Sequence, residues 1–139
     1  MKQRPIGLQL AQTARAVTAA FERAMAEAGG SASTWQVLLI VRSQRWGNQA
    51  EIAREMGITG ATLTHHLNAL ERQGLVRRRR EDRDRRVQRV ELTDEGAALF
   101  ERLRAVASEH DARLRAALAP GEVEQLRELL ERLRRGLDY

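Results

Sequence analysis

The sequence predicts a mainly α-helical fold with one small β-hairpin. Apolar residues recur at helical spacing through most of the 139 residues. Near residue 90 the pattern changes, because Val90 and Leu92 alternate with Arg89 and Glu91 as in a half-buried strand. Charged residues make up 31% of the chain and hydrophobic residues 42%, a balance typical of an ordered globular domain. Both patterns fit into a single domain over residues 1–139.

A long N-terminal helix is expected from about residue 6 to residue 28. Its apolar stripe, spaced by four, three, four and four positions, consists of Leu10, Ala14, Val17, Phe21 and Met25. The pair Gly29 and Gly30 ends this helix.

The next segment, from Ser33 to Ser43, is interpreted as a buried helix. Its central run VLLIV also fits a buried strand by composition alone. Ser33 and Gln36 have the spacing of a capping box, in which each side chain bonds the backbone N–H of the other residue. Together with the flanking Trp35 and Arg42, this spacing favours a helix.

Two short helices follow, at about 48–56 and 59–74. Asn48 and Glu51 have capping-box spacing at the start of the first helix. Gly57 breaks the chain, and only two residues separate it from the second helix. Two short helices joined by a turn that contains glycine predict a helix-turn-helix, whose second helix enters a DNA groove. The alternative is an ordinary helical hairpin within a bundle.

The second of these helices has an apolar back and a short polar front. Leu63, Leu67 and Leu70 recur at i, i+4 and i+7, so they form one stripe toward the core. Thr59 is the expected N-cap, and Gly74 is the expected residue after the C-cap. The front and its flanks, which suit insertion into a groove, consist of Ala61, Thr62, Thr64, His65, Asn68 and Arg72.

Residues 75–93 are expected to form an antiparallel hairpin with its tip near residues 81–85. Beside a helix-turn-helix, such a hairpin is a wing. The segment 77–89 holds eight arginines and three acidic residues, a net charge of +5 that equals the formal net charge of the whole chain. Basic charge concentrated in one segment indicates that a polyanion binds there.

Two further helices are expected at the C-terminal end. Thr93 caps the first, which runs to about Leu118, and Pro120 is placed at the first position of the second. The first has an apolar stripe of Leu99, Leu103, Val106, His110 and Leu114. The second has a heptad seam of Val123, Leu126, Leu130, Leu133 and Leu137. A monomer would leave this seam exposed, so we infer an obligate homodimer with dimerisation helices at about 6–28 and 94–137.

The wing resembles that of the MarR family of bacterial transcriptional regulators, whose members carry the pattern D-R-R-x-x-x-V-x-L-T-x-x-G. The matching residues here are Asp84, Arg85, Arg86, Val90, Leu92, Thr93 and Gly96. Upstream, AEIAREMGITGATLTHHLNALERQGLVRR resembles the family's helix-turn-helix and first wing strand. The order of elements matches over nearly the whole chain. The resemblance implies a winged helix-turn-helix lobe at about 33–93, flanked by the long dimerisation helices.

The resemblance also implies a ligand-responsive homodimeric repressor that binds a pseudo-palindromic operator in double-stranded DNA. Arg86 matches the family's minor-groove residue, and Asp84 matches the carboxylate that orients the wing-tip arginines. The expected DNA-binding residues are Thr59, Ala61, Thr62, Thr64, His65, Asn68, Arg72, Arg79, Arg83, Asp84, Arg85 and Arg86. Many members release DNA when a small aromatic or phenolic ligand binds beside the DNA-binding lobe, near which Trp35 and Leu39 would lie. Core packing is the alternative for Trp35.

Other classes of function find little support in the sequence. The chain has no cysteine, which excludes thiolate metal sites and thiol-based sensing and fits a cytoplasmic protein. The longest apolar run, Val37 to Val41, is far too short to span a bilayer, so no membrane partner is expected. There is no catalytic triad order, Gly-rich phosphate loop or metal-ligand cluster. The adjacent His65 and His66 point about 100° apart around their helix and cannot easily share one metal ion. We therefore expect no enzyme activity and no cofactor.

Three alternatives stay open from the sequence. His110, on an apolar stripe, is interpreted as an interface histidine, with a ligand contact or a pH switch as the other reading. The chain as a whole could also be a non-regulatory architectural nucleic-acid-binding winged-helix protein. A third reading is a protein-interaction scaffold in which the basic hairpin meets an acidic partner.

Overall fold

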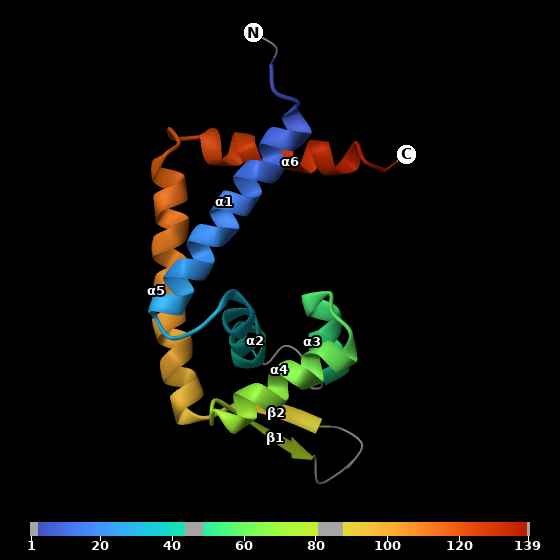
Figure 1. Cartoon of the computed structure of the whole chain (residues 1–139), viewed down its shortest axis with the longest axis vertical. Helices are drawn as coiled ribbons and strands as arrows, with labels where there is room; N and C mark the ends of the chain where they lie inside the picture. Colours follow the sequence, from blue (N-terminus) through green and yellow to red (C-terminus); the bar gives the residue numbers. More distant parts are fainter. Residues whose placement is uncertain (1–2, 44–48, 81–87, 139) are drawn as a thin grey trace. The chain divides into compact units, whose positions relative to one another are not determined.

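The computed structural model describes residues 3–43, 49–80 and 88–138. The elements in chain order (Figure 1) are α1 (Ile6–Glu27), α2 (Ala32–Ser43), α3 (Gln49–Met56), α4 (Gly60–Arg72), β1 (Val76–Arg80), β2 (Gln88–Leu92), α5 (Asp94–Ala116) and α6 (Glu122–Arg135). They fall into two compact units, Met1–Val106 and Ala107–Tyr139, and α5 has residues in both. The predicted mainly helical fold with one small hairpin is confirmed.

The turn between α3 and α4 is made by Gly57. Its φ of +68° lies in the left-handed region, which glycine adopts without the steric cost of a β-carbon. The N–H groups of Gly57 and Ile58 bond the carbonyls of Arg54 and Ala53, each at 3.1 Å, so the last turn of α3 is closed. The same arrangement follows α4 at Gly74, where φ is +74°. This confirms Gly74 as the residue after the C-cap.

Two of the predicted N-caps are confirmed. The backbone N–H of Thr62 donates to the hydroxyl of Thr59 at 3.1 Å at the start of α4. The backbone N–H of Gly96 donates to the hydroxyl of Thr93 at 3.0 Å at the start of α5. The third predicted cap, Asn48 before α3, lies outside the described residues.

The predicted cap of α2 is wrong, although the helix itself is confirmed. The hydroxyl of Ser31 accepts the backbone N–H of Thr34 at 3.0 Å, and α2 begins at Ala32. Ser33 is therefore already inside the first turn, where its own N–H needs a partner and its side chain is exposed. Both serines fit the cap pattern by residue type, and the earlier one takes the position because the chain turns there.

The predicted start of α6 at Pro120 is also wrong. Gly121 has φ +87°, which is incompatible with a right-handed helix, so α6 begins at Glu122 and Pro120 lies in the preceding turn. The carboxylate of Glu122 accepts the N–H of Ala119 and closes that turn. Glu122 and Glu124 both lie in the first turn of α6, where their charge complements the positive end of the helix dipole.

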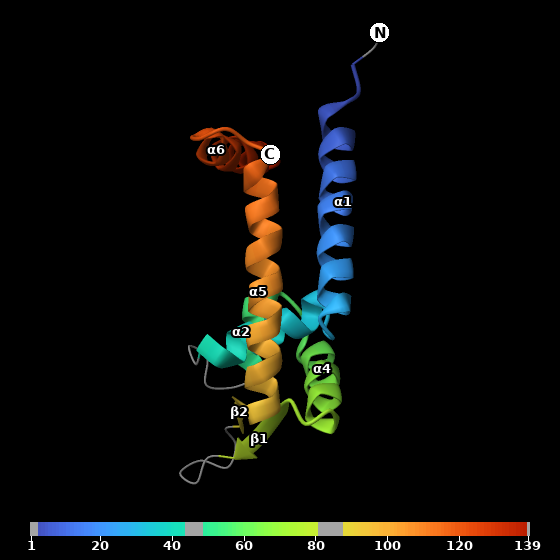
Figure 2. The ribbon, with the colours of Figure 1, turned by 90° about the vertical axis from the view of Figure 1, so that its left-hand side faces the viewer.

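Helix α2 supplies the centre of the core of the first unit. Val37 and Leu38 are both 0% exposed, and α2 packs against α1, α3 and β2. In Figure 2, α2 lies behind the N-terminal half of α5. The largest fully buried side chains are Met25, Val37, Leu38, Ile52, Leu63, Leu67 and Leu103. This core holds α3, α4 and the hairpin in a fixed arrangement.

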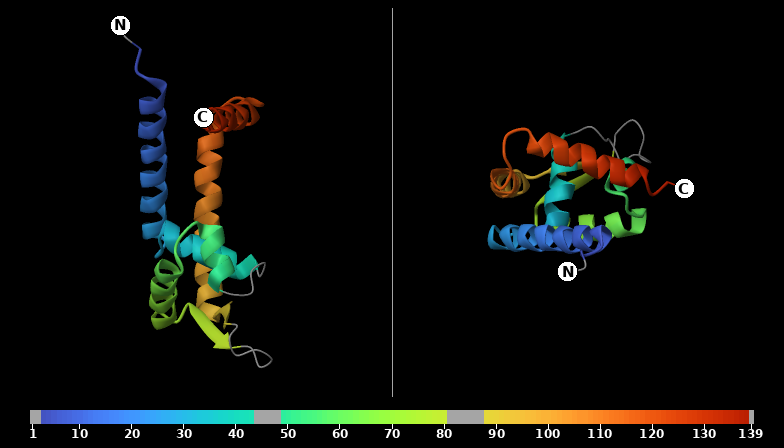
Figure 3. Two further views of the ribbon diagram at one scale, coloured as in Figure 1. Left: turned by 90° about the vertical axis from the view of Figure 1, so that its right-hand side faces the viewer. Right: turned by 90° about the horizontal axis from the view of Figure 1, so that it is seen from above.

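The hairpin is also confirmed. Strands β1 and β2 are antiparallel, with Val76 opposite Leu92 and Arg78 opposite Val90. The chain enters β1 from the C-terminal end of α4, and the hairpin extends away from that end (Figure 3). Val76 is 2% exposed and anchors the base of the hairpin in the core. The predicted tip at 81–85 lies outside the described residues.

The apolar stripes of the terminal helices are partly exposed. In α1, Met25 is 0% exposed whereas Leu10 is 41% exposed. Helix α6 has no buried residue, and Leu126, Leu130 and Leu133 are 44%, 41% and 45% exposed. No helix in the described part of the chain has the length and apolar character needed to cross a membrane.

Candidate nucleic-acid interface

The front of α4 is the first part of the candidate interface. On its back, Leu63 and Leu67 are 0% exposed and Leu70 is 4% exposed, so the helix can present only one face. The predicted reading residues that are exposed on that face are Thr59, Ala61, Thr62, His65 and Arg72, and the half-buried ones are Thr64 and Asn68. Local helical periodicity is sufficient to bring these residues together.

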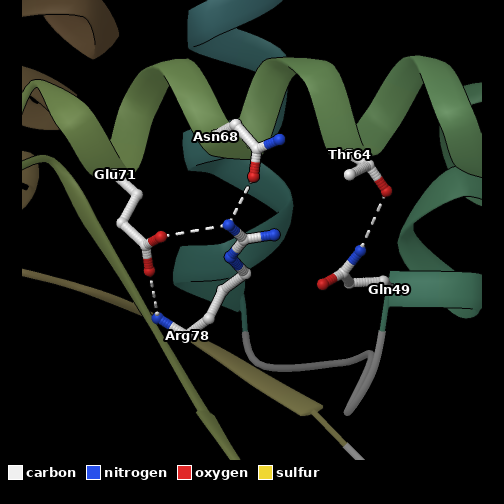
Figure 4. Close-up of polar contacts among 5 residues, drawn as sticks. All are labelled: Gln49, Thr64, Asn68, Glu71 and Arg78. Atoms are coloured by element: carbon white, nitrogen blue, oxygen red, sulfur yellow. Dashed lines mark hydrogen bonds and ion pairs between the residues drawn. The ribbon is translucent and has the colours of Figure 1, made fainter.

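Thr64 joins α4 to α3. Its hydroxyl donates to the carbonyl of Gly60 at 2.9 Å. It also accepts from the side-chain amide of Gln49 at 3.4 Å (Figure 4). A threonine hydroxyl has a single hydrogen to donate. Because that hydrogen is used within α4, Thr64 retains no donor for the acceptor oxygens of a phosphate. The contact with Gln49 instead links α4 to α3.

A three-residue network connects α4 to the wing. Arg78, on β1, donates from one guanidinium nitrogen, Nη2, to Oδ1 of Asn68 and to Oε1 of Glu71, the latter at 3.0 Å (Figure 4). The backbone N–H of Arg78 also donates to Oε2 of Glu71 at 3.3 Å. The side chain of Arg78 is only 18% exposed. Arg78 is therefore committed to the protein and is not a free phosphate contact.

The same network changes the acidity of Glu71. The side-chain hydrogen bond from Arg78 is the main cause that lowers the pKa of Glu71 from its ordinary value of 4.5, and partial desolvation opposes this effect. The carboxylate is thus favoured in its charged form, which is the form that accepts from both the guanidinium and the backbone N–H.

The other three arginines of β1 are exposed and remain available to a polyanion. Arg77 and Arg80 are exposed. Arg79 lies 3.6 Å from the carboxylate of Glu91, and the two side chains are 64% and 40% exposed, so water screens this ion pair strongly. The predicted wing-tip residues lie outside the described part of the chain, and they are Arg83, Asp84, Arg85 and Arg86.

The two residues predicted to contact a ligand lie one turn apart on α2. The ring of Trp35 stacks on that of Phe100, with centroids 5.4 Å apart and an interplanar angle of 13°. Phe100 is 5% exposed, so core packing accounts for one face of the indole. Leu39 is 41% exposed, an unusual exposure for an aliphatic residue on the central core helix.

No metal site is formed by the residues that the structure describes, since no group of three His, Cys, Asp or Glu side chains converges there. The rings of His65 and His66 are 6.2 Å apart and tilted. His65 is exposed on the front of α4, and His66 is half-buried at the edge of the core. The expectation that the chain needs no cofactor stays a prediction.

Sequence reasoning missed Arg78, Glu71 and Gln49. Residues 77–80 form one basic run in the sequence, and that run hides the alternation of a strand. Val76 is buried, and a period of two places Arg78 on the same face of β1, toward α4. The sequence therefore contained the alternation that groups Arg78 with Val76. To infer the contact of Arg78 from it, one must also know that α4 covers that face of the hairpin.

A family model and a curated relative both match this chain. The family model described as MarR family matches residues 31–87. Over 107 residues the chain is 32% identical to YdgJ of Bacillus subtilis strain 168, an uncharacterised HTH-type transcriptional regulator. The match covers 77% of this chain and 63% of YdgJ, so the chain spans less than two thirds of that relative.

Solved structures resemble the chain over nearly its full length. The transcriptional repressor CouR, bound to a 23-mer DNA duplex, has a TM-score of 0.82 and 28% identity, with 96% of this chain and 99% of that one covered. CouR from Rhodococcus jostii RHA1 bound to p-coumaroyl-CoA has a TM-score of 0.76 and 27% identity, with 92% and 90% covered.

Proposed function

We propose that this chain, which belongs to the MarR family of transcriptional regulators, is a homodimeric repressor that binds a pseudo-palindromic DNA operator. One observation carries the proposal. Helix α4 buries its leucine stripe completely and turns short, uncharged or hydrogen-bonding side chains outward, beside a hairpin rich in arginine. The front of α4 suits base edges in the major groove, and the arginines suit phosphates and the minor groove.

The charge distribution supports this division of roles. The front of α4 has Arg72 as its only charged residue, whereas β1 carries the exposed Arg77, Arg79 and Arg80. Phosphate contacts set affinity and its salt dependence, while base contacts set sequence preference. Arg86 is proposed as the minor-groove residue, with Asp84 orienting the wing-tip arginines. Both proposals rest on the match to the family pattern.

The exposed leucines of α6 support a homodimer. They would cost free energy if left in water, and a second copy of α6 offers an equivalent apolar seam. A two-fold dimer places two copies of α4 on one face of the duplex, so the operator should be an inverted repeat.

A small aromatic ligand is the proposed effector. One CouR repressor has been solved with DNA, and CouR from Rhodococcus jostii RHA1 has been solved with p-coumaroyl-CoA, whose acyl group carries a phenol. In the present chain, Trp35 and Leu39 are the proposed contacts, with Leu39 exposed and Trp35 half-buried. Phenolic acids and their thioesters should release the chain from its operator, and aliphatic acids of equal charge should not.

Selection of bound sites from random duplexes tests the proposed function. We expect an inverted repeat with half-site centres about 10 base pairs apart and a preference over bulk DNA of at least ~10³. Equal affinity for every duplex would favour an architectural protein instead. Failure to shift any duplex at low salt would favour the protein-interaction scaffold.

A further inference from the structure

The side chain of Asn68 is held in one orientation by an arginine of the wing. Nη2 of Arg78 donates to Oδ1 of Asn68, and its second hydrogen is directed to Oε1 of Glu71 at 3.0 Å. Figure 4 shows the oxygen of Asn68 facing the guanidinium and the nitrogen turned away from it. A flipped amide would set its NH₂ group against the guanidinium, donor against donor. The network therefore fixes which end of the amide faces outward.

Glu71 makes this orientation persistent. Its two carboxylate oxygens accept from the guanidinium and from the backbone N–H of Arg78. Arg78 is consequently attached to α4 at two points, in addition to the contact with Asn68, and its side chain is only 18% exposed. Rotation of the Asn68 amide would break a charge-assisted hydrogen bond without offering a replacement.

We infer that Asn68 acts toward the DNA as a hydrogen-bond donor, and that Arg78 is the positioning residue that makes it one. This inference rests on the proposed function. An asparagine that reads adenine uses its oxygen for the N6 amino group and its nitrogen for N7. Here the oxygen already accepts from a cation, and a second donor brought to it would face the guanidinium hydrogens. The partner of Asn68 is therefore an acceptor of the duplex, which is guanine O6, thymine O4, N7 of either purine, or a phosphate oxygen.

The first experiment identifies the acceptor. Wild type and Asn68→Ala are compared on the selected operator and on all its single-base variants. If Asn68 donates to a base, Asn68→Ala loses about 10-fold discrimination at one position occupied by guanine, thymine or adenine. Replacing the purine with its 7-deaza analogue tests donation to N7. If Asn68 donates to a phosphate, Asn68→Ala loses affinity evenly over the panel. Both results support the inference and distinguish the two sources.

The second experiment isolates the positioning role. Arg78→Met keeps the aliphatic stem and removes the donors, and Arg77→Met removes the same charge from an exposed neighbour on β1. Both variants should bind DNA more weakly. At the base that Asn68 contacts, only Arg78→Met should become able to use the 6-amino group of adenine, because only in that variant is the amide free to rotate. If the contact is to a phosphate, only Arg78→Met should lose it.

A third variant distinguishes the two roles of Asn68, which are to accept from Arg78 and to donate to the DNA. Asn68→Asp retains an oxygen for Arg78 but has no N–H to donate. Its melting temperature should equal or exceed that of wild type, while its loss of DNA affinity should be at least that of Asn68→Ala.

The outcomes are distinct. The inference is overturned if Asn68→Ala binds like wild type, or if wild type requires the 6-amino group of an adenine at that position while Asn68→Ala does not. The inference is also overturned if Arg78→Met keeps the base preference of wild type and if Asn68→Ala costs the same affinity in the Arg78→Met background as in wild type. A wild-type chain that binds no duplex overturns the proposed function itself, and the inference with it.

Discussion

A β-carbon placed on Gly96 would lie 1.9 Å from the carbonyl oxygen of Leu75. The same carbonyl accepts the backbone N–H of Thr93 at 3.1 Å, and the hydroxyl of Thr93 donates to the carbonyl of Gly74. The start of α5 is thus hydrogen-bonded to the residues that follow α4. This close approach is the physical reason for the glycine that completes the family pattern in this chain.

Replacing Gly96 with alanine should destabilise the chain by about 1–3 kcal/mol or more, because the obstructing atom belongs to the backbone and cannot rotate away. Denaturant unfolding followed by circular dichroism measures the change. Gly7→Ala is the matched control, since no atom lies within 4 Å of the position of its β-carbon. The control should retain or slightly exceed the stability of wild type. Equal midpoints for Gly96→Ala and wild type would contradict the packing described here.

Much of the helix-turn-helix could be predicted because its determinants are local. The cap at Thr59 depends on a residue three positions away, and the left-handed turns at Gly57 and Gly74 depend on neighbours within one helical turn. The same locality explains the confirmed cap at Thr93. Where two local signals competed, as with Ser31 and Ser33 before α2, residue type alone could not decide between them.

The network of Arg78 could not be predicted in the same way. It joins residues seven and ten positions apart through the packing of β1 against α4, and that packing is a property of the tertiary fold. In the sequence, Arg78 is one of four consecutive arginines and Glu71 is an ordinary helical acid. The front of α4 was predictable from periodicity, but the commitment of Asn68 and Thr64 to internal hydrogen bonds was not.

Stability should fall at acidic pH in part through Glu71. Its pKa is lowered in the folded chain by Arg78, so the unfolded chain binds the proton first and the stabilisation is present above the ordinary value of 4.5. It is lost as the pH falls through the lower, folded pKa. Glu71→Gln should therefore differ most from wild type at neutral pH and approach it as the pH falls below the lowered pKa of the folded chain. Thermal melts over pH 3–7 measure this, with Glu55→Gln, an exposed residue of α3, as the control. A difference that grows toward low pH would contradict the assignment.

Polar substitution of the α6 seam should weaken the proposed dimer. Leu130 and Leu133 are 41% and 45% exposed, and burying that exposed part against a partner would stabilise the complex by about 0.6–1.4 kcal/mol for each leucine in each of the two copies. Leu130→Gln with Leu133→Gln should raise the dissociation constant at least about 100-fold, as measured by sedimentation equilibrium. Glu128→Gln with Glu131→Gln changes the same helix at other exposed positions and should leave the dimer intact. A dimer unaffected by the leucine changes would place the interface elsewhere.

The last prediction separates the wing from the reading helix. Arg86 is proposed to reach the minor groove, where A·T and T·A present the same acceptors, so it can sense groove width but little sequence. His65 is exposed on the front of α4 and is proposed to approach base edges in the major groove, where every base pair is distinct. Arg86→Ala should therefore weaken binding to all sequences and flatten the salt dependence, because fewer counterions are released.

His65→Ala should leave the salt slope nearly unchanged and relax the preference at particular positions, each worth about 1–3 kcal/mol. The measurement is the affinity of both variants over a salt series and over a panel of single-base operator variants. Thr13→Ala, on the exposed surface of α1, is the control that should alter neither quantity. If His65→Ala lowers affinity evenly over the panel while Arg86→Ala rewrites the base preference, then the two elements have been assigned to the wrong grooves. The front of α4 would then no longer support sequence reading by this helix.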